Sequence, residues 1–217
     1  MLNRSDYVNS LNSLIENPCK FKSISSDLTS SRLSTLQSYL CTFLKRGEIN
    51  ETEHTFLRPT HAHFARAHGL PKTHKQFDTL PKLRPIIDTT NTPHYKVGKF
   101  IANLLNPLTL NKFLLQDSFD ANDAIKSIPK DLFSQGYKFV SFDVESLFTN
   151  VSLRKTINIV LDRIYKQNII NTTLRKSTLK KLIIDLCTKT IFPCNGILYE
   201  QLDGVFMGSF LGFSSLS

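Results

Sequence analysis

The stretch that most constrains the fold is YKFVSFDVESLFTN, residues 137–150. Its first part, Tyr137 to Phe142, is an apolar run rich in aromatic and β-branched residues, with the length of one strand. Asp143 follows directly, where such a strand would end. A carboxylate at the end of a rigid strand is well placed to bind a metal ion, although many aspartates simply end a strand at a turn. The neighbouring motifs distinguish a metal-binding Asp143 from an aspartate that only ends a strand.

The size and charge of the chain limit its class. It has 217 residues, of which 41% are hydrophobic, so it can build a sizeable core in one large domain or two small ones. Lys and Arg number 27 against 18 Asp and Glu, which gives a net charge of +9 and a pI near 9.4. This excess favours a polyanionic partner, although solvated lysine faces give similar values.

Nothing in the sequence indicates export or a membrane span. The N-terminus has no apolar signal region, and no apolar run approaches the roughly 18 residues that a span requires. The four cysteines form no C-x-x-C pair and show no zinc-finger spacing, so we expect reduced thiols. We therefore expect an intracellular protein, nuclear or cytoplasmic, that is neither secreted nor membrane-bound.

Residues 1–59 are predicted to form an N-terminal helical segment. Apolar residues at helical spacing indicate helices over residues 6–17 and 33–46, and Gly47 is positioned to cap the second. The same pattern predicts four helices further along the chain, over residues 94–108, 117–128, 152–164 and 179–186.

Between residues 60 and 90 the chain becomes rich in proline, histidine and basic residues. Ala62–His68 and Leu83–Asp88 are strand-like, and the Gly and Pro residues between them predict a hairpin with a long basic tip. The tip would bring together Lys72, His74, Lys75, Lys82 and Arg84. It is either a solvated loop or a phosphate clamp, for which the planar guanidinium of Arg84 is best suited.

A second hairpin is predicted by Asn195-Gly196, which stands between two apolar runs in residues 191–201. The hairpin leads directly into QLDGVFMGS, residues 201–209. Two glycines in this stretch suit a backbone that a ligand approaches closely.

Four motifs in this order resemble the reverse transcriptase domain of Penelope-like retroelements. They are GLPKTHK (69–75), LRPI (83–86), FDVESLFTNVS (142–152) and CNGILYEQLDGVFMGS (194–209). The segment at 92–119 is similar to the connecting segment of that family. The resemblance covers roughly residues 60–217 and implies an α+β right-hand polymerase, with fingers-like elements and connecting helices over 60–136. Residues 137–217 would be a partial palm, an antiparallel sheet with covering helices.

The resemblance implies an RNA-directed DNA polymerase, which takes an RNA template, a DNA primer and deoxynucleoside triphosphates. Asp143 would be the first catalytic aspartate and would hold two Mg²⁺ ions, helped by the backbone carbonyl of Val144. These ions would activate the primer 3′-hydroxyl and neutralise the triphosphate. Phe148 matches the steric gate that excludes a ribose 2′-hydroxyl, although a core phenylalanine is the alternative.

The resemblance also implies nucleotide and template contacts. Arg84, together with Lys72 and Lys75, matches the finger residues that neutralise the incoming triphosphate. Gln201 matches a position against the nascent base pair. The loop against the template would continue through Gly204, Met207, Gly208 and Ser209.

Two departures from the family pattern bear on activity. Phe206, Phe210 and Phe213 replace an alanine and two prolines, which would crowd the loop and loosen its turn. The chain also stops before the Tyr-x-Asp-Asp motif, the thumb and the GIY-YIG endonuclease region that many members carry. We therefore expect a reverse transcriptase fragment that is inactive alone and poorly soluble. The alternatives are a non-catalytic basic nucleic-acid-binding relic and a decayed fragment with no role.

Overall fold

The computed structural model describes residues 3–60, 63–72, 82–108, 115, 117–142 and 152–202. The chain has an α+β fold rich in helix, as the sequence predicts. The helices are α1 (Arg4–Ile15), α2 (Thr29–Lys45), α3 (Glu51–Leu57), α4 (Tyr95–Leu105), α5 (Ser118–Lys126), α6 (Asp131–Ser134), α8 (Leu153–Tyr165) and α9 (Lys176–Thr188), and a short 3-10 helix follows α4 (Asn106–Leu108). The strands are β1 (Phe21–Ile24), β2 (Arg66–Pro71), β3 (Leu83–Asp88), β4 (Ile191–Cys194) and β5 (Ile197–Gln201).

The strands form two antiparallel sheets that lie beside each other. One sheet has the order β1-β5-β4, and the other is the hairpin of β2 and β3. The backbone N–H of Ala65, just before β2, donates to the carbonyl of Ile191 at the start of β4 at 2.9 Å. This bond places the β2–β3 hairpin next to the larger sheet.

The turn between β4 and β5 confirms the predicted second hairpin. Asn195 and Gly196 both have positive φ, 49° and 79°, which is the backbone that a two-residue hairpin turn requires. The predicted antiparallel pairing of the first hairpin is also confirmed, since β2 and β3 pair from Arg66 opposite Asp88 to Pro71 opposite Leu83.

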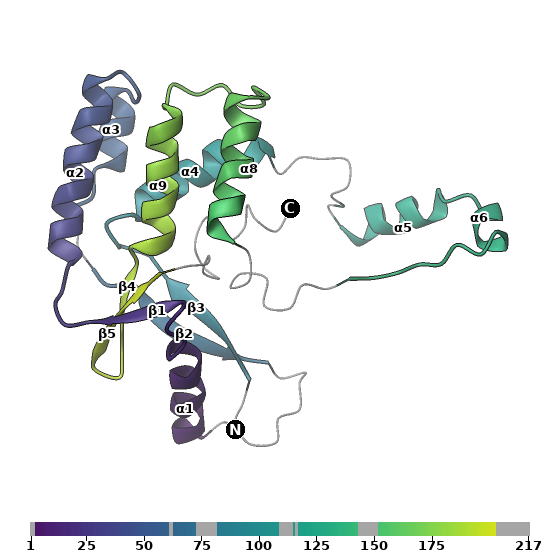
Figure 1. Cartoon of the computed structure of the whole chain (residues 1–217), viewed down its shortest axis with the longest axis horizontal. Coiled ribbons are helices and arrows are strands. Elements are labelled where there is room, and N and C mark those ends of the chain that lie inside the picture. The colour runs from purple at the N-terminus through teal and green to yellow at the C-terminus, as the bar shows by residue number, and fades with distance from the viewer. Residues whose placement is uncertain are drawn as a thin grey trace.

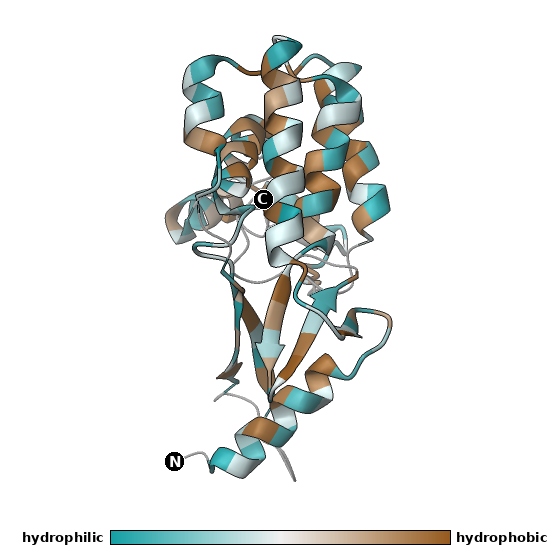
Figure 2. Cartoon of the chain, turned by 90° about the vertical axis from the view of Figure 1, so that its left-hand side faces the viewer, coloured by the Kyte–Doolittle hydropathy of each residue, from teal (hydrophilic) through white to brown (hydrophobic). Residues whose placement is uncertain are grey.

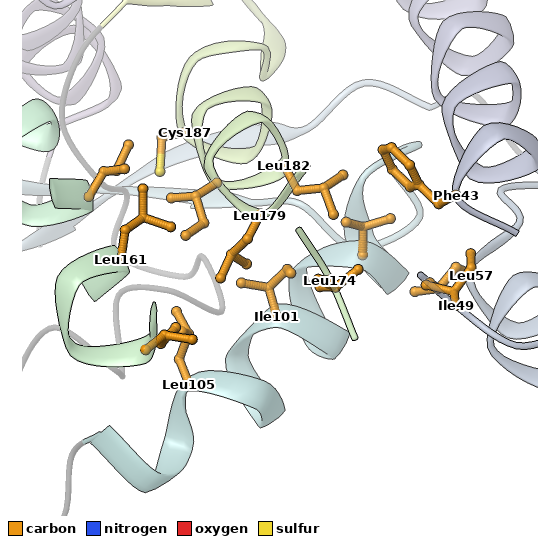
Figure 3. Packing of buried hydrophobic residues seen from close by; sticks show 14 of the residues in the cluster. Phe43, Ile49, Leu57, Ile101, Leu105, Leu161, Leu174, Leu179, Leu182 and Cys187 are labelled. Carbon is orange, nitrogen blue, oxygen red and sulfur yellow. The ribbon is translucent and has the colours of Figure 1, made fainter. Parts of the chain in front are cut away.

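The larger hydrophobic core lies among the helices. In Figure 1, helices α2, α3, α4, α8 and α9 gather on one side of the strands. Figure 3 shows their apolar side chains meeting, with Leu179 of α9 and Ile101 of α4 near the centre. Both are fully buried. The predicted apolar faces of α2, α4, α8 and α9 therefore pack against one another as the sequence pattern indicates.

A second, smaller core joins α1 to the strands. Leu11 and Ile15 of α1 pack with Phe21, Leu83, Ile87 and Phe192 of the strands. Figure 2 shows α1, next to the N-terminus, at the end of the strands away from the other helices. The strands therefore lie between α1 and the larger group of helices.

The connection between α2 and α3 is fixed by local capping. Gly47 has φ +67°, its N–H donates to the carbonyl of Leu44, and the N–H of Glu48 donates to Phe43. These two bonds form a Schellman motif and confirm Gly47 as the predicted cap. Asn50 and Glu53 then form a reciprocal capping box that starts α3. The sequence analysis did not predict α3, although the Asn-x-x-Glu spacing was a usable signal.

Two strand predictions need correction. Tyr137–Phe142 was predicted as a strand, but in the structure it belongs to no sheet, and its large side chains are exposed. Strand propensity does not produce a strand without a partner, and no described strand pairs with this segment. The predicted strand at Ala62–His68 is shifted to Arg66–Pro71, so Gly69, Leu70 and Pro71 pair with β3 rather than turning away from it.

Residues 117–142 form an arm. Figure 1 shows α5, α6 and the segment after them standing away from the helices and strands of the main body. Asp117 caps α5, accepting hydrogen bonds from the N–H groups of Phe119 and Asp120. No residue of α5 is buried. None of the described helices is long and apolar enough to cross a membrane.

Candidate nucleic-acid interface

The β2–β3 hairpin separates its residues onto two faces. Gly69 and Leu83 are buried and point toward the core that includes α1, where the Gly69 N–H donates to the Tyr7 hydroxyl at 2.8 Å. Because side chains alternate along a strand, the neighbouring positions lie on the other face. The residues of this outer face are Arg66, His68 and Leu70 on β2, and Arg84, Ile86 and Asp88 on β3.

Cationic side chains line the outer face and the open end of the hairpin. Arg84 is exposed and stands directly opposite Leu70. Beyond the last strand pair, the Lys72 N–H donates to the Lys82 carbonyl at 2.8 Å, so two lysines continue the ladder toward the tip. Arg66 and His68 extend the same face away from the tip. We call Arg66, His68, Lys72, Lys82 and Arg84 the basic hairpin.

Asp88 is the acidic residue of this face, and it is ionised in its local environment. Hydrogen bonds from the side chain and backbone N–H of Thr90 lower the pKa of Asp88, and the nearby charges of Arg66 and His68 lower it further. The carboxylate lies opposite Arg66 at the end of the hairpin far from Arg84. Its charge therefore offsets Arg66 more than it offsets Arg84 or the lysines.

The basic hairpin can contact phosphate oxygens. A guanidinium on a strand offers paired donors in a fixed plane, and lysines on either side add positive charge without a fixed geometry. Sequence reasoning named Arg84, Lys72 and Lys82 but missed Arg66. The signal was present, because Arg66, His68 and Leu70 alternate with small or buried residues at strand spacing.

The structure brings together only some of the predicted site residues. Lys72 and Arg84 lie on the same hairpin. Gln201 lies elsewhere, at the end of β5 opposite Phe21, and its residue is 2% exposed. Its backbone N–H donates to the carbonyl of Thr190 at 3.2 Å. Gln201 is therefore buried within the sheet, and a contact with a nucleotide at this position requires the side chain to be uncovered.

The remaining predicted site residues lie outside the described residues. They are Lys75 in the hairpin tip, Asp143, Val144 and Phe148 after the arm, and Gly204, Met207, Gly208 and Ser209 near the C-terminus. Within the described ranges, no group of three or more His, Cys, Asp or Glu side chains gathers as metal ligands would.

No family model, curated protein or solved structure matches the chain.

Proposed function

We propose that this chain forms the fingers and part of the palm of an RNA-directed DNA polymerase of the Penelope-like type. The observation that carries the proposal is the exposed position of Arg84 on an antiparallel hairpin, inside the LRPI motif. A guanidinium held on a strand suits the phosphates of a nucleotide or a nucleic-acid backbone. The order of the four sequence motifs supports the same function.

In this proposal the basic hairpin binds the incoming deoxynucleoside triphosphate and the adjacent nucleic acid. Arg84 and Lys72, with Lys75, neutralise the triphosphate as charge develops on the leaving pyrophosphate. Lys82 and Arg66 add backbone phosphate contacts, which are independent of sequence. A polymerase of this kind works in the nucleus or the cytoplasm on an RNA template and a DNA primer.

The proposal gives the reaction to Asp143. Its carboxylate and the carbonyl of Val144 are hard oxygen donors of the kind that Mg²⁺ prefers. Asp143 and Val144 would hold Mg²⁺ there, and the ion would supply the positive charge needed to lower the pKa of the primer 3′-hydroxyl and to neutralise the triphosphate. Phe148 then excludes a ribose 2′-hydroxyl. The loop residues Gly204, Met207, Gly208 and Ser209 contact the template, and Gln201 contacts the nascent pair once its buried side chain is uncovered.

A non-catalytic nucleic-acid binder is the second candidate. It is favoured by the basic hairpin itself, which needs no carboxylate and no metal ion to bind phosphates. The net charge of +9 supports it equally.

Binding to an RNA–DNA primer-template duplex tests what the two candidates share. We expect binding that weakens steeply with salt, and Arg84→Ala should lower affinity and reduce the slope of log K against log salt by about 1. Lys126→Ala, on the exposed end of α5, is the matched loss of one positive charge. Binding that is insensitive to salt, or equally affected by both substitutions, would exclude the basic hairpin as the interface.

Primer extension tests the expectation that the chain is inactive alone. Mg²⁺-dependent extension that Asp143→Ala abolishes would overturn that expectation and would favour the polymerase over the non-catalytic binder. Salt-dependent binding without extension fits both candidates. If the chain neither extends nor binds the duplex, both candidates are wrong.

A further inference from the structure

A small cavity lies where two helices begin. It has a volume of about 40 Å³, enough for a few water molecules or one compact group. Its walls come from the first turn of α2, the turn that leads into α4, and the residues between α9 and β4. His63, just before β2, and Thr89, just after β3, complete it. The cavity thus lies at the base of the basic hairpin, at the opposite end from Lys72 and Lys82.

The lining of the cavity combines apolar side chains, such as Leu186 and Ile191, with several hydrogen-bond donors. It includes Arg32, Lys189, two histidines and several threonines, and within the described part of the chain no Asp or Glu lines it. Both helices also direct their N-terminal ends toward it, since Thr29 begins α2 and Tyr95 begins α4. Neither helix has a hydrogen bond from an N-cap side chain, although Asp27 accepts from the Thr29 N–H at 2.8 Å. Helix N-termini favour negatively charged ligands.

The Thr29 hydroxyl points independently to a missing ligand. Thr29 lines the cavity and is 4% exposed, and its Oγ1 atom is buried without a hydrogen-bond partner among the described residues. A buried hydroxyl without a partner is destabilising, so such groups are rare unless a ligand or water satisfies them.

The two cations of the cavity are held in place by acids that stand outside it. Arg32 donates to the Lys189 carbonyl at 2.6 Å and pairs with Glu200 at 2.5 Å. Lys189 pairs with Asp185 at 2.8 Å. These pairs orient the side chains before any ligand arrives, and they also offset part of the positive charge. The cavity therefore offers fixed donors and a modest positive potential, which suits a compact oxyanion better than a large polyanion.

From this geometry we infer that the cavity binds a phosphoryl group. The group is inorganic phosphate, the terminal phosphate of a nucleotide, or a phosphate of a nucleic-acid chain. The volume of about 40 Å³ admits the phosphoryl group but not a nucleoside, which would remain outside. The site is distinct from the basic hairpin and does not depend on polymerase activity.

Calorimetric titration of the purified chain with inorganic phosphate, at constant ionic strength, tests the inference. We expect saturable binding that Thr29→Val weakens about fivefold to tenfold, because one hydrogen bond to a charged group is lost. Thr35→Val is the matched control, since Thr35 lies on the same helix but is exposed. Lys189→Met is a second test that does not depend on Thr29, and it should weaken binding at least as much.

Two further titrations identify the source of the phosphoryl group. A deoxynucleoside triphosphate and a short single-stranded DNA are titrated into the same variants. The ligand whose affinity falls in Thr29→Val but not in Thr35→Val is the one that occupies the cavity. If none of the three probes binds saturably, or if each binds Thr29→Val and Thr35→Val equally, the inference is wrong.

Discussion

The carboxylate of Glu48 accepts a hydrogen bond from the backbone N–H of Arg175 at 3.1 Å, although the two residues are 127 positions apart. Glu48 is 2% exposed, and Arg175 is the N-cap residue of α9. Arg175 provides no side-chain cap of its own. The carboxylate of Glu48 therefore caps α9 from another part of the chain, next to the positive end of the helix.

Further contacts tie Glu48 to the same region. Its other carboxylate oxygen lies 3.5 Å from the Arg175 side chain, and its backbone carbonyl accepts from the Thr173 hydroxyl at 2.7 Å. The negative charge also reaches Tyr165, whose pKa is raised to about 12, mainly by burial and then by Glu48. Glu48 thus joins the α2–α3 connection to the start of α9 and the end of α8.

We expect substitutions of Glu48 to destabilise the whole helical core. Glu48→Gln should lower the free energy of unfolding by about 1–2 kcal/mol, because the charge at the helix end is lost while one acceptor remains. Glu48→Ala should cost more, about 2–3 kcal/mol, since the α9 cap is lost entirely together with the buried side chain. Urea denaturation measures both values. Asp162→Asn is the control, because the Asp162 ion pairs with Lys166 and Lys176 are exposed and should contribute nothing measurable. Equal effects of Glu48→Gln and Asp162→Asn would contradict the capping role.

His94 gives the folded chain a pH dependence. Burial lowers the pKa of His94 from 6.5 to about 4, against the opposing charge of Asp185 and with help from Lys189 and Arg32. Above pH 6.5 His94 is neutral in both the folded and the unfolded state, so it contributes no pH dependence. As the pH falls below 6.5 the unfolded state takes up a proton that the folded state excludes. Stability therefore decreases between pH 6.5 and about 4 and then levels off.

At pH 5 this effect should cost roughly 2 kcal/mol relative to pH 7.5, at about 1.4 kcal/mol for each unit of pKa difference. Denaturation in phosphate-free buffer at both values measures it. His94→Asn should remove this component of the pH dependence, since asparagine does not titrate. Identical pH profiles for the two proteins would show that His94 is not protected from protonation.

Short sequence signals predicted the turns and helix caps, because these depend on the backbone conformation of one or two neighbouring residues. Asn195-Gly196 predicted its turn because few residues adopt two successive positive φ values. Gly47 predicted the end of α2 because glycine readily adopts the positive φ that a helix C-cap requires. By contrast, β1 was missed. Its residues Phe21–Ile24 lie in a polar stretch and become a strand only by pairing with β5, about 180 positions later.

The same distinction applies to the candidate site. The Gly and Pro turns predicted a hairpin with Arg84 in its basic tip, and the structure places Arg84 exposed on that hairpin, within β3 and opposite Leu70. The burial of Gln201 was not predictable from its own segment, because β5 becomes the central strand of its sheet only by pairing with β1, about 180 positions earlier in the chain. The strand expected at Tyr137–Phe142 failed for the converse reason, since its composition favours a strand but no described segment pairs with it.

Gly69 should not tolerate a side chain. A Cβ atom at this position would lie 2.6 Å from Leu83 Cδ1 and 3.1 Å from Leu83 Cβ, and Leu83 is buried. Gly69→Ala should therefore lower the free energy of unfolding by about 1–3 kcal/mol through overpacking. Leu70→Ala, the next residue but on the exposed face, should change stability by less than about 0.5 kcal/mol.

The double variant Gly69→Ala/Leu83→Ala identifies the cause. If the clash with Leu83 accounts for the cost, the double variant should lose less stability than the sum of its two single variants. Additive losses would mean that Gly69 is required for a reason other than this contact.

Phe142 should be replaceable without loss of stability. It is 92% exposed at the end of the arm, and Tyr137 and Val140 on the same segment are also largely exposed. Because its ring is almost fully in contact with water, Phe142→Ser removes little buried area and should change the free energy of unfolding by less than about 0.5 kcal/mol. The substitution should also reduce self-association, since it interrupts an exposed apolar segment. Light scattering over a range of protein concentrations measures the second effect. If Phe142→Ser lowers the free energy of unfolding by more than about 1 kcal/mol, the Phe142 ring is buried in solution and the prediction is wrong.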